Sequence, residues 1–115
     1  MTRITAYRFG HLRIDNKSYT SDLIIYPDGT VRDEWWRRRG HHLAASDIMA
    51  LIDAGPEMLI VGTGASGLLR PEPELCDLLT ARGIELLARP TAEAITSYND
   101  LAADHRVGAC FHLTC

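Results

Sequence analysis

The first part of the chain alternates short runs of apolar and β-branched residues with clusters of turn-forming residues. Such runs are typical of β-strands, and they cover residues 4–9, 12–14, 18–20, 22–26 and 30–36. Asp15-Asn16 favours a turn between the second and third runs. Pro27-Asp28-Gly29 favours a turn between the last two, because Pro fixes φ, Asp bonds its own backbone and Gly adopts positive φ. Residues 1–45 therefore predict two antiparallel hairpins.

From residue 46 onward, apolar residues three and four positions apart alternate with short continuous apolar runs. The first spacing indicates amphipathic helices, and the second indicates buried strands. Helices are expected to begin at caps Ser46 and Thr91 and after Pro73, and strands to cover 58–61, 84–88 and 107–113. Strands joined by helices form a mostly parallel sheet. The predicted fold class is α/β, with an antiparallel N-terminal β portion, in one domain of residues 1–115.

The composition and charge of the chain limit the kinds of partner and the cellular compartment that we expect for it. A net charge of −3 argues against a general attraction to nucleic acid or to membranes. The three cysteines, Cys76, Cys110 and Cys115, form no C-x-x-C motif, and their odd number favours a reducing compartment. The N-terminus has no apolar signal region, and no apolar stretch approaches the ~20 residues of a membrane span. We therefore expect a cytoplasmic protein without a transmembrane segment.

The chain is organised around residues 57–67, where an apolar strand ends in three glycines. Ligand sites of open α/β sheets lie beyond the carboxyl ends of strands. We therefore expect any small-ligand site in the loop Gly62, Thr63, Gly64, Ala65 and Ser66, bordered by Trp36, His42 and Arg106. Two other interpretations stay open: backbone binding of an anion, and a strand exit that only packs tightly against a neighbour.

The letters of this loop match the G-x-G-x-x-G motif of dinucleotide-binding proteins, but its context does not. In that motif a helix begins inside the loop and presents its N–H groups to the pyrophosphate. Here residues 68–73 separate the last glycine from the next predicted helix, and the following strand ends at Ala88-Arg89 without an acidic residue. We expect no nicotinamide cofactor, and no other cofactor.

A second stretch combines aromatic and basic side chains: Trp35, Trp36, Arg37, Arg38 and Arg39. Such residues can stack on bases and contact phosphates, but they also dominate protein interfaces. Acidic residues precede the stretch and the whole chain is negative, so a protein contact through Trp35, Trp36, Arg37 and Arg38 is favoured over nucleic acid. Because neighbouring side chains of a strand face opposite ways, one tryptophan is expected in the core and the other outside.

The remaining polar residues give no catalytic or metal-binding pattern. The five histidines lack metal-ligand spacing, and there is no nucleophile motif or paired-carboxylate site. A general-base role for His42 beside the glycine loop stays open. Structural roles are expected for Thr91 as a helix cap, Tyr98 as a helix anchor, Asn99 as a partner of a nearby loop and Arg106 as a partner of helix C-terminal carbonyls.

Several motifs in order resemble the MTH938-like family, a set of small domains of unknown function. They are Trp35-Trp36-Arg37, His41-His42-Leu43, residues 60–64, Arg82-Gly83-Ile84-Glu85 and Thr91 through Leu101. The resemblance covers about Tyr7 to Leu113 and implies a layered α/β fold with an extra β element, but no reaction. The family includes mitochondrial complex I assembly factor 3 proteins and adipogenesis-associated Mth938 domain proteins.

Two functions follow as hypotheses. The first is a non-catalytic interaction or assembly domain, more of a binding module than an enzyme, with a protein partner such as a respiratory-complex subunit. The second is a small-ligand-binding protein or enzyme that uses the Gly62–Ser66 loop. The sequence leaves the oligomeric state and the role of Cys115 open.

Overall fold

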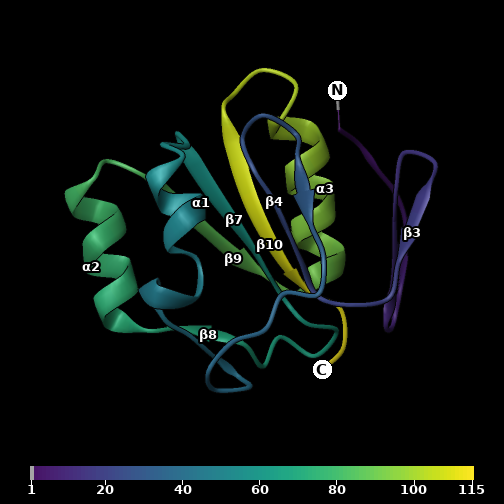
Figure 1. Cartoon of the computed structure of the whole chain (residues 1–115), viewed down its shortest axis with the longest axis horizontal. Coiled ribbons are helices and arrows are strands. Elements are labelled where there is room, and N and C mark those ends of the chain that lie inside the picture. The colour runs from purple at the N-terminus through teal and green to yellow at the C-terminus, as the bar shows by residue number, and fades with distance from the viewer. Residues whose placement is uncertain (1) are drawn as a thin grey trace.

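The computed structural model describes residues 2–115 and is built on a five-stranded mixed sheet (Figure 1). The strands are β4 (Leu23–Ile25), β5 (Val31–Arg32), β7 (Met58–Thr63), β9 (Glu85–Arg89) and β10 (Val107–His112). Their order is β5-β4-β10-β7-β9. β10 pairs parallel with β7 and antiparallel with β4, and β7 pairs parallel with β9. The most apolar strands, β7 and β10, thus occupy the interior of the sheet, where both faces are covered.

The helices cover the two faces of this sheet. α1 (Met49–Asp53) and α2 (Pro73–Ala81) share a core with Leu59, Val61 and Cys110. The opposite face, with Ile60, Ala109 and Phe111, packs on α3 (Thr91–Leu101). Alternate residues of β7 and β10 therefore enter two different cores, as the pleat of a strand requires.

The N-terminal residues form a separate three-stranded antiparallel sheet of β1 (Ile4–Arg8), β2 (His11–Ile14) and β3 (Lys17–Tyr19). Buried Leu12, Ile14 and Tyr19 join the core on the α3 side. Asn99 of α3 ties β1 to this core, since its side chain accepts a hydrogen bond from the Ile4 N–H and donates one to the Ile4 carbonyl. The predicted loop partner of Asn99 is therefore a strand.

One small sheet was not predicted. β6 (His42–Leu43) and β8 (Arg70–Pro71) form a two-stranded parallel sheet. It joins the segment after the Arg-rich stretch to the segment after the glycine loop. Both strands have only two residues, too short to give a periodic signal in the sequence.

The predicted α/β class, both hairpins and the three crossover helices are confirmed, but several boundaries are wrong. The strand expected over 30–36 ends at Arg32, because Glu34 adopts a φ of 51° and its N–H binds the Ser21 hydroxyl. Ser46 does not cap a helix but lies inside the 3₁₀ turn η1 (Ala45–Asp47). Thr91 is not a cap either, because Pro90 occupies that position.

Candidate functional site

The glycine loop at the carboxyl end of β7 is packed against the end of the chain. A Cβ atom on Gly62 would lie 2.6 Å from Cδ1 of Phe111. Gly64 has a φ of +101°, and a Cβ atom there would lie 2.7 Å from the Thr114 carbonyl oxygen and 2.8 Å from Cδ2 of His112. Both positions need glycine because backbone or core side chains approach them closely.

Thr91 explains why the loop holds this shape. Its hydroxyl accepts a hydrogen bond from the Gly64 N–H at 2.9 Å and donates one to the His112 carbonyl at 2.6 Å. The Ala65 N–H binds the Thr114 carbonyl at 2.7 Å. Two N–H groups that an anion would need are therefore bonded within the chain, which favours the tight-exit interpretation of the glycines.

The structure separates one of the residues expected to border this loop, Arg106, from it. The placement of Arg106 there is wrong: it precedes Val107, which pairs with Met58 at the opposite end of β7. Its guanidinium donates to the carbonyls of Ala54 and Gly55 after α1, so the expected bond to helix C-terminal carbonyls is present. A binding role for Gly62–Ser66 stays a prediction.

Beside the loop lies a buried charged cluster of Asp22, Arg37 and His112. Asp22 Oδ2 lies 2.8 Å from both Arg37 Nη1 and His112 Nδ1, and Oδ1 accepts the Leu113 N–H at 2.8 Å. The three side chains are at most 9% exposed. Burial alone would raise the pKa of Asp22, but the hydrogen bonds from His112, Leu113 and Arg37 outweigh it and hold that pKa below its usual value.

The histidine of this cluster has one nitrogen without a partner. At 2.8 Å from a carboxylate, Nδ1 carries the proton and donates, so Arg37 Nη2, 3.3 Å away, is a contact and not its donor. Among residues 2–115, no group bonds the buried Nε2, and the ring of His41 lies edge-on with its centroid 6.0 Å away. An oriented imidazole is thus present, but no hydroxyl or thiol of the described chain bonds it as a nucleophile would.

The Arg-rich stretch divides between this interior and the surface. Trp35 is buried, donates its indole N–H to the Asp47 carbonyl at 2.9 Å, and has the Arg37 guanidinium 4.8 Å above its ring. Trp36, in contrast, is 72% exposed. The expected split between one core and one outer tryptophan is confirmed, although neither residue lies in a strand.

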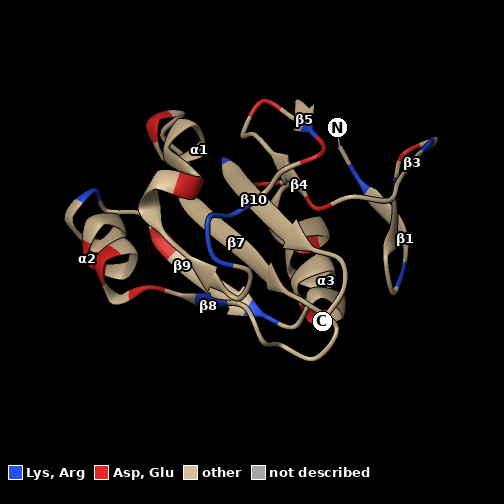
Figure 2. Cartoon of the chain, turned by 60° about the horizontal axis from the view of Figure 1, so that its bottom comes forward, with Lys and Arg blue, Asp and Glu red and all other residues tan. Residues whose placement is uncertain are grey.

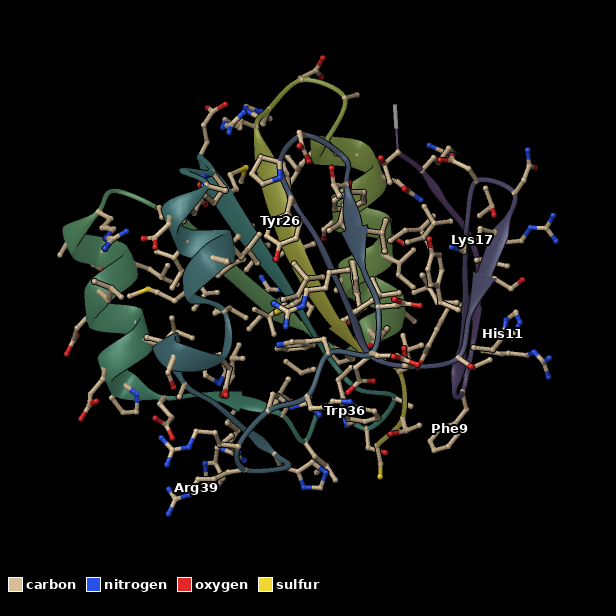
Figure 3. The ribbon with its side chains drawn as sticks, viewed as in Figure 1. Phe9, His11, Lys17, Tyr26, Trp36 and Arg39 are labelled. Atoms are coloured by element: carbon tan, nitrogen blue, oxygen red, sulfur yellow. The ribbon has the colours of Figure 1, made fainter. Side chains whose placement is uncertain are left out.

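The exposed half of the stretch borders a hollow of about 460 Å³ in the surface. We call it the Trp36 hollow, and its lining includes Tyr26, Arg32, Trp36, Arg38 and Met49. Figure 3 labels two of these residues, Tyr26 and, below it, Trp36. In Figure 2 the consecutive arginines form the continuous blue stretch of coil near the centre. The hollow therefore combines aromatic and aliphatic surface with two arginines and with Asp47, whose carboxylate accepts the N–H groups of Arg38 and Ala44.

A neighbouring hollow of about 340 Å³ contains His42, together with Arg38, Arg39, Asp47 and Glu72. Its basic and acidic residues balance, and the Asp47 carboxylate already accepts the N–H groups of Arg38 and Ala44. His42 thus lies in β6, opposite Arg70 and beside the Arg-rich stretch, and none of Gly62–Ser66 lines the hollow that contains it.

Comparison with known proteins places the chain in a family. A family model described as a protein of unknown function (DUF498/DUF598) matches residues 4–112, nearly the whole chain. The chain belongs to this family.

Solved structures agree with this family and its fold. The conserved hypothetical protein PH1505 from Pyrococcus horikoshii OT3 is 30% identical with a TM-score of 0.88, over 98% of this chain and 99% of its own. The protein MT938 is 28% identical with a TM-score of 0.82, over 100% of both chains. A Bartonella henselae protein described as an outer membrane protein is 27% identical with a TM-score of 0.84, over 99% of this chain and 96% of its own. The predicted MTH938-like resemblance is confirmed.

Neither the DUF498/DUF598 family nor the resemblance pointed to Asp22 or His112. Both carry a signal in the sequence, however, because Asp22 directly precedes a buried apolar run and His112 lies within one. A polar residue in a fully buried strand must find a partner. Tyr26 and Met49 were also missed, because nothing in the sequence joins a hairpin turn to a helix start.

Among residues 2–115 no helix is long and apolar enough to cross a membrane.

Proposed function

We propose that this protein is a non-catalytic interaction domain that binds another protein through the Trp36 hollow. The single observation that carries the proposal is the 72% exposure of Trp36 at the border of a hollow that Met49, itself 38% exposed, also lines. Leaving a large aromatic side chain in water forgoes the free energy of its burial. Tryptophan and arginine at a concave apolar surface are typical of the residues that dominate protein interfaces.

The shape of the stretch supports a preformed surface. Trp35 and Arg37, on either side of Trp36, are fixed by the Asp47 carbonyl and by Asp22. Because both neighbours are held inside the protein, the Trp36 backbone is held as well. A partner therefore binds without the entropic cost of ordering this segment.

The chemistry of the surface indicates the kind of partner. Tyr26, Trp36 and Met49 offer apolar area, while Arg32 and Arg38 offer charge to an acidic residue. We therefore propose a partner segment that places an aromatic or aliphatic side chain beside acidic ones. A respiratory-complex subunit is one such partner by analogy with the assembly factors of the MTH938-like family. That identity and a cytoplasmic location remain proposals.

The test is quantitative affinity capture with the wild-type chain, Trp36→Ala and Arg38→Glu. Both substitutions should remove the same specific partner and leave folding unchanged. The matched control is Phe9→Ala, which removes another exposed aromatic side chain, 63% exposed in the wild type, from outside the hollow. A partner that Phe9→Ala removes equally, or that Trp36→Ala retains, would contradict the proposal.

Small-ligand binding at Gly62–Ser66 is the alternative hypothesis. Ala65 and Ser66 are exposed, although the N–H of Ala65 is already bonded. A thermal-shift screen with nucleotides, inorganic phosphate and organic acids tests it. Stabilisation that Ser66→Ala abolishes would support this alternative, and no stabilisation by any of these compounds would remove it.

A further inference from the structure

The two edges of the central sheet differ in how much backbone they leave open. β5 forms one edge with two residues, whereas β9 forms the other with five (Figure 1). Within residues 2–115, β9 pairs with β7 alone. Its central residues Leu86, Leu87 and Ala88 are only partly buried. Exposed edges are usually protected by a proline, a lysine or an inward-pointing charge, and the interior of β9 has none of these.

The direction of the β9 amide groups follows from one hydrogen bond. The Glu85 N–H donates to the Glu57 carbonyl, on the β7 side, at 3.1 Å. Amide groups of successive strand residues point to opposite sides. The N–H and C=O groups of Leu86 and Ala88 therefore point away from the sheet, where another strand can bind them.

Charges at the ends of β9 complement one another under one particular pairing. In an antiparallel pair of β9 strands centred on Leu87, Leu86 lies opposite Ala88 of the other copy, and Glu85 lies opposite Arg89. Leu86 and Ala88 are the residues whose amide groups face outward, so this register forms four backbone hydrogen bonds. It also places two Glu–Arg pairs across the junction, on the same face as Leu87.

We infer that two copies of this protein associate through antiparallel pairing of their β9 strands, centred on Leu87, into one continuous sheet. The contact is the same on both copies, as a two-fold dimer requires. In the single chain, Arg89 Nη1 donates to the Ala88 carbonyl at 3.0 Å. In the dimer the Arg89 guanidinium turns to Glu85 of the second copy and leaves that carbonyl to the Leu86 N–H. This dimer is independent of the Trp36 hollow, because β9 contributes no residue to that hollow.

The test is sedimentation of the wild-type chain over a range of concentrations, together with charge variants. Wild-type protein should shift from monomer to dimer as concentration rises. Glu85→Arg and Arg89→Glu each place like charges opposite one another at both pairs and should weaken the dimer at least about tenfold. The double variant Glu85→Arg/Arg89→Glu restores opposite charges and should recover dimerisation. A mixture of the two single variants should form the mixed dimer in preference to either homodimer.

A backbone variant completes the experiment. Ala88→Pro removes an outward N–H from an edge strand, where proline is tolerated, and should abolish the dimer. If it fails to fold, the charge variants decide the question alone. A wild-type chain that stays monomeric, or a double variant that associates no better than the single variants, would overturn the inference.

Discussion

Trp35 and Arg37 lie inside the protein, whereas Trp36 and Arg38, the residues that alternate with them, lie at its surface. The inner pair has defined partners: the Trp35 indole donates to the Asp47 carbonyl, and Arg37 binds Asp22. Trp36 is 72% exposed beside the Trp36 hollow. Identical side-chain chemistry thus serves the stability of the fold at two positions and is available to a partner at the other two.

This difference teaches how to interpret a motif that mixes aromatic and basic residues. The four residues were predicted together as a protein-contact patch, and only Trp36 and Arg38 are exposed enough to act as one. Only the residues whose side chains are exposed should therefore be assigned to an interaction patch. Substituting the inner and outer members of each pair tests this division directly.

The largest effect is expected from the tryptophans. Trp35→Ala removes a side chain that is 1% exposed and should lower the free energy of unfolding by about 4 kcal/mol. Trp36→Ala should change it by less than about 0.5 kcal/mol, because the side chain is largely in water. Urea unfolding of both variants measures the difference. Equal losses would mean that Trp36 is part of the core and not of a binding surface.

Substitution of the inner and the outer arginine should show the same contrast, with a smaller difference in the free energy of unfolding. Arg37→Met leaves the Asp22 carboxylate with His112 and the Leu113 N–H as partners and should cost about 3 kcal/mol. Arg38→Met should cost less than about 0.5 kcal/mol, because its side chain is exposed. Chemical denaturation of the two variants provides the measurement. A tolerated Arg37→Met would show that His112 and the Leu113 N–H together can hold the buried charge.

Gly64→Ala tests how tightly the glycine loop at the carboxyl end of β7 packs against residues 112–115. The added Cβ would lie 2.7 Å from the Thr114 carbonyl oxygen at a φ of +101°, and we expect a loss of about 2 kcal/mol. Gly83→Ala is the matched control, because Gly83 also has positive φ, +70°, but no atom within 4 Å of an added Cβ. Its cost should be about 1 kcal/mol, from the backbone conformation alone. Equal costs in thermal unfolding would indicate that residues 112–115 move away from the loop.

The sequence could predict the strands and helices because their periodicity is local. The division of the interior into two cores is also predictable from local sequence, because alternate residues of β7 and β10 must face helices on opposite sides of the sheet. The buried cluster could not be predicted, because Asp22 and His112 come together only when β10 pairs with β4, 90 positions apart in the chain. Arg106 failed for a different reason: it precedes a strand of a sheet predicted to be mostly parallel, so it belongs at the amino end of that strand, opposite the carboxyl end of β7.

Protonation of the buried Asp22 carboxylate at acidic pH should lower the free energy of unfolding, and this is the smallest of the expected effects. The pKa of Asp22 lies below its usual value of 3.8 in the folded protein, so the unfolded chain binds a proton first as pH falls. The contribution of Asp22 is therefore complete above pH 3.8 and is lost as pH drops through the lower folded value. Asp22→Asn should flatten the dependence of unfolding free energy on pH in this acidic range.

Asp28→Asn is the control for this prediction. The Thr30 N–H also lowers the pKa of Asp28, but the Asp28 side chain is in solvent, so its substitution should alter the slope less. If the slope survives Asp22→Asn and not Asp28→Asn, the buried cluster is held by its shape and its hydrogen bonds rather than by the charge of Asp22.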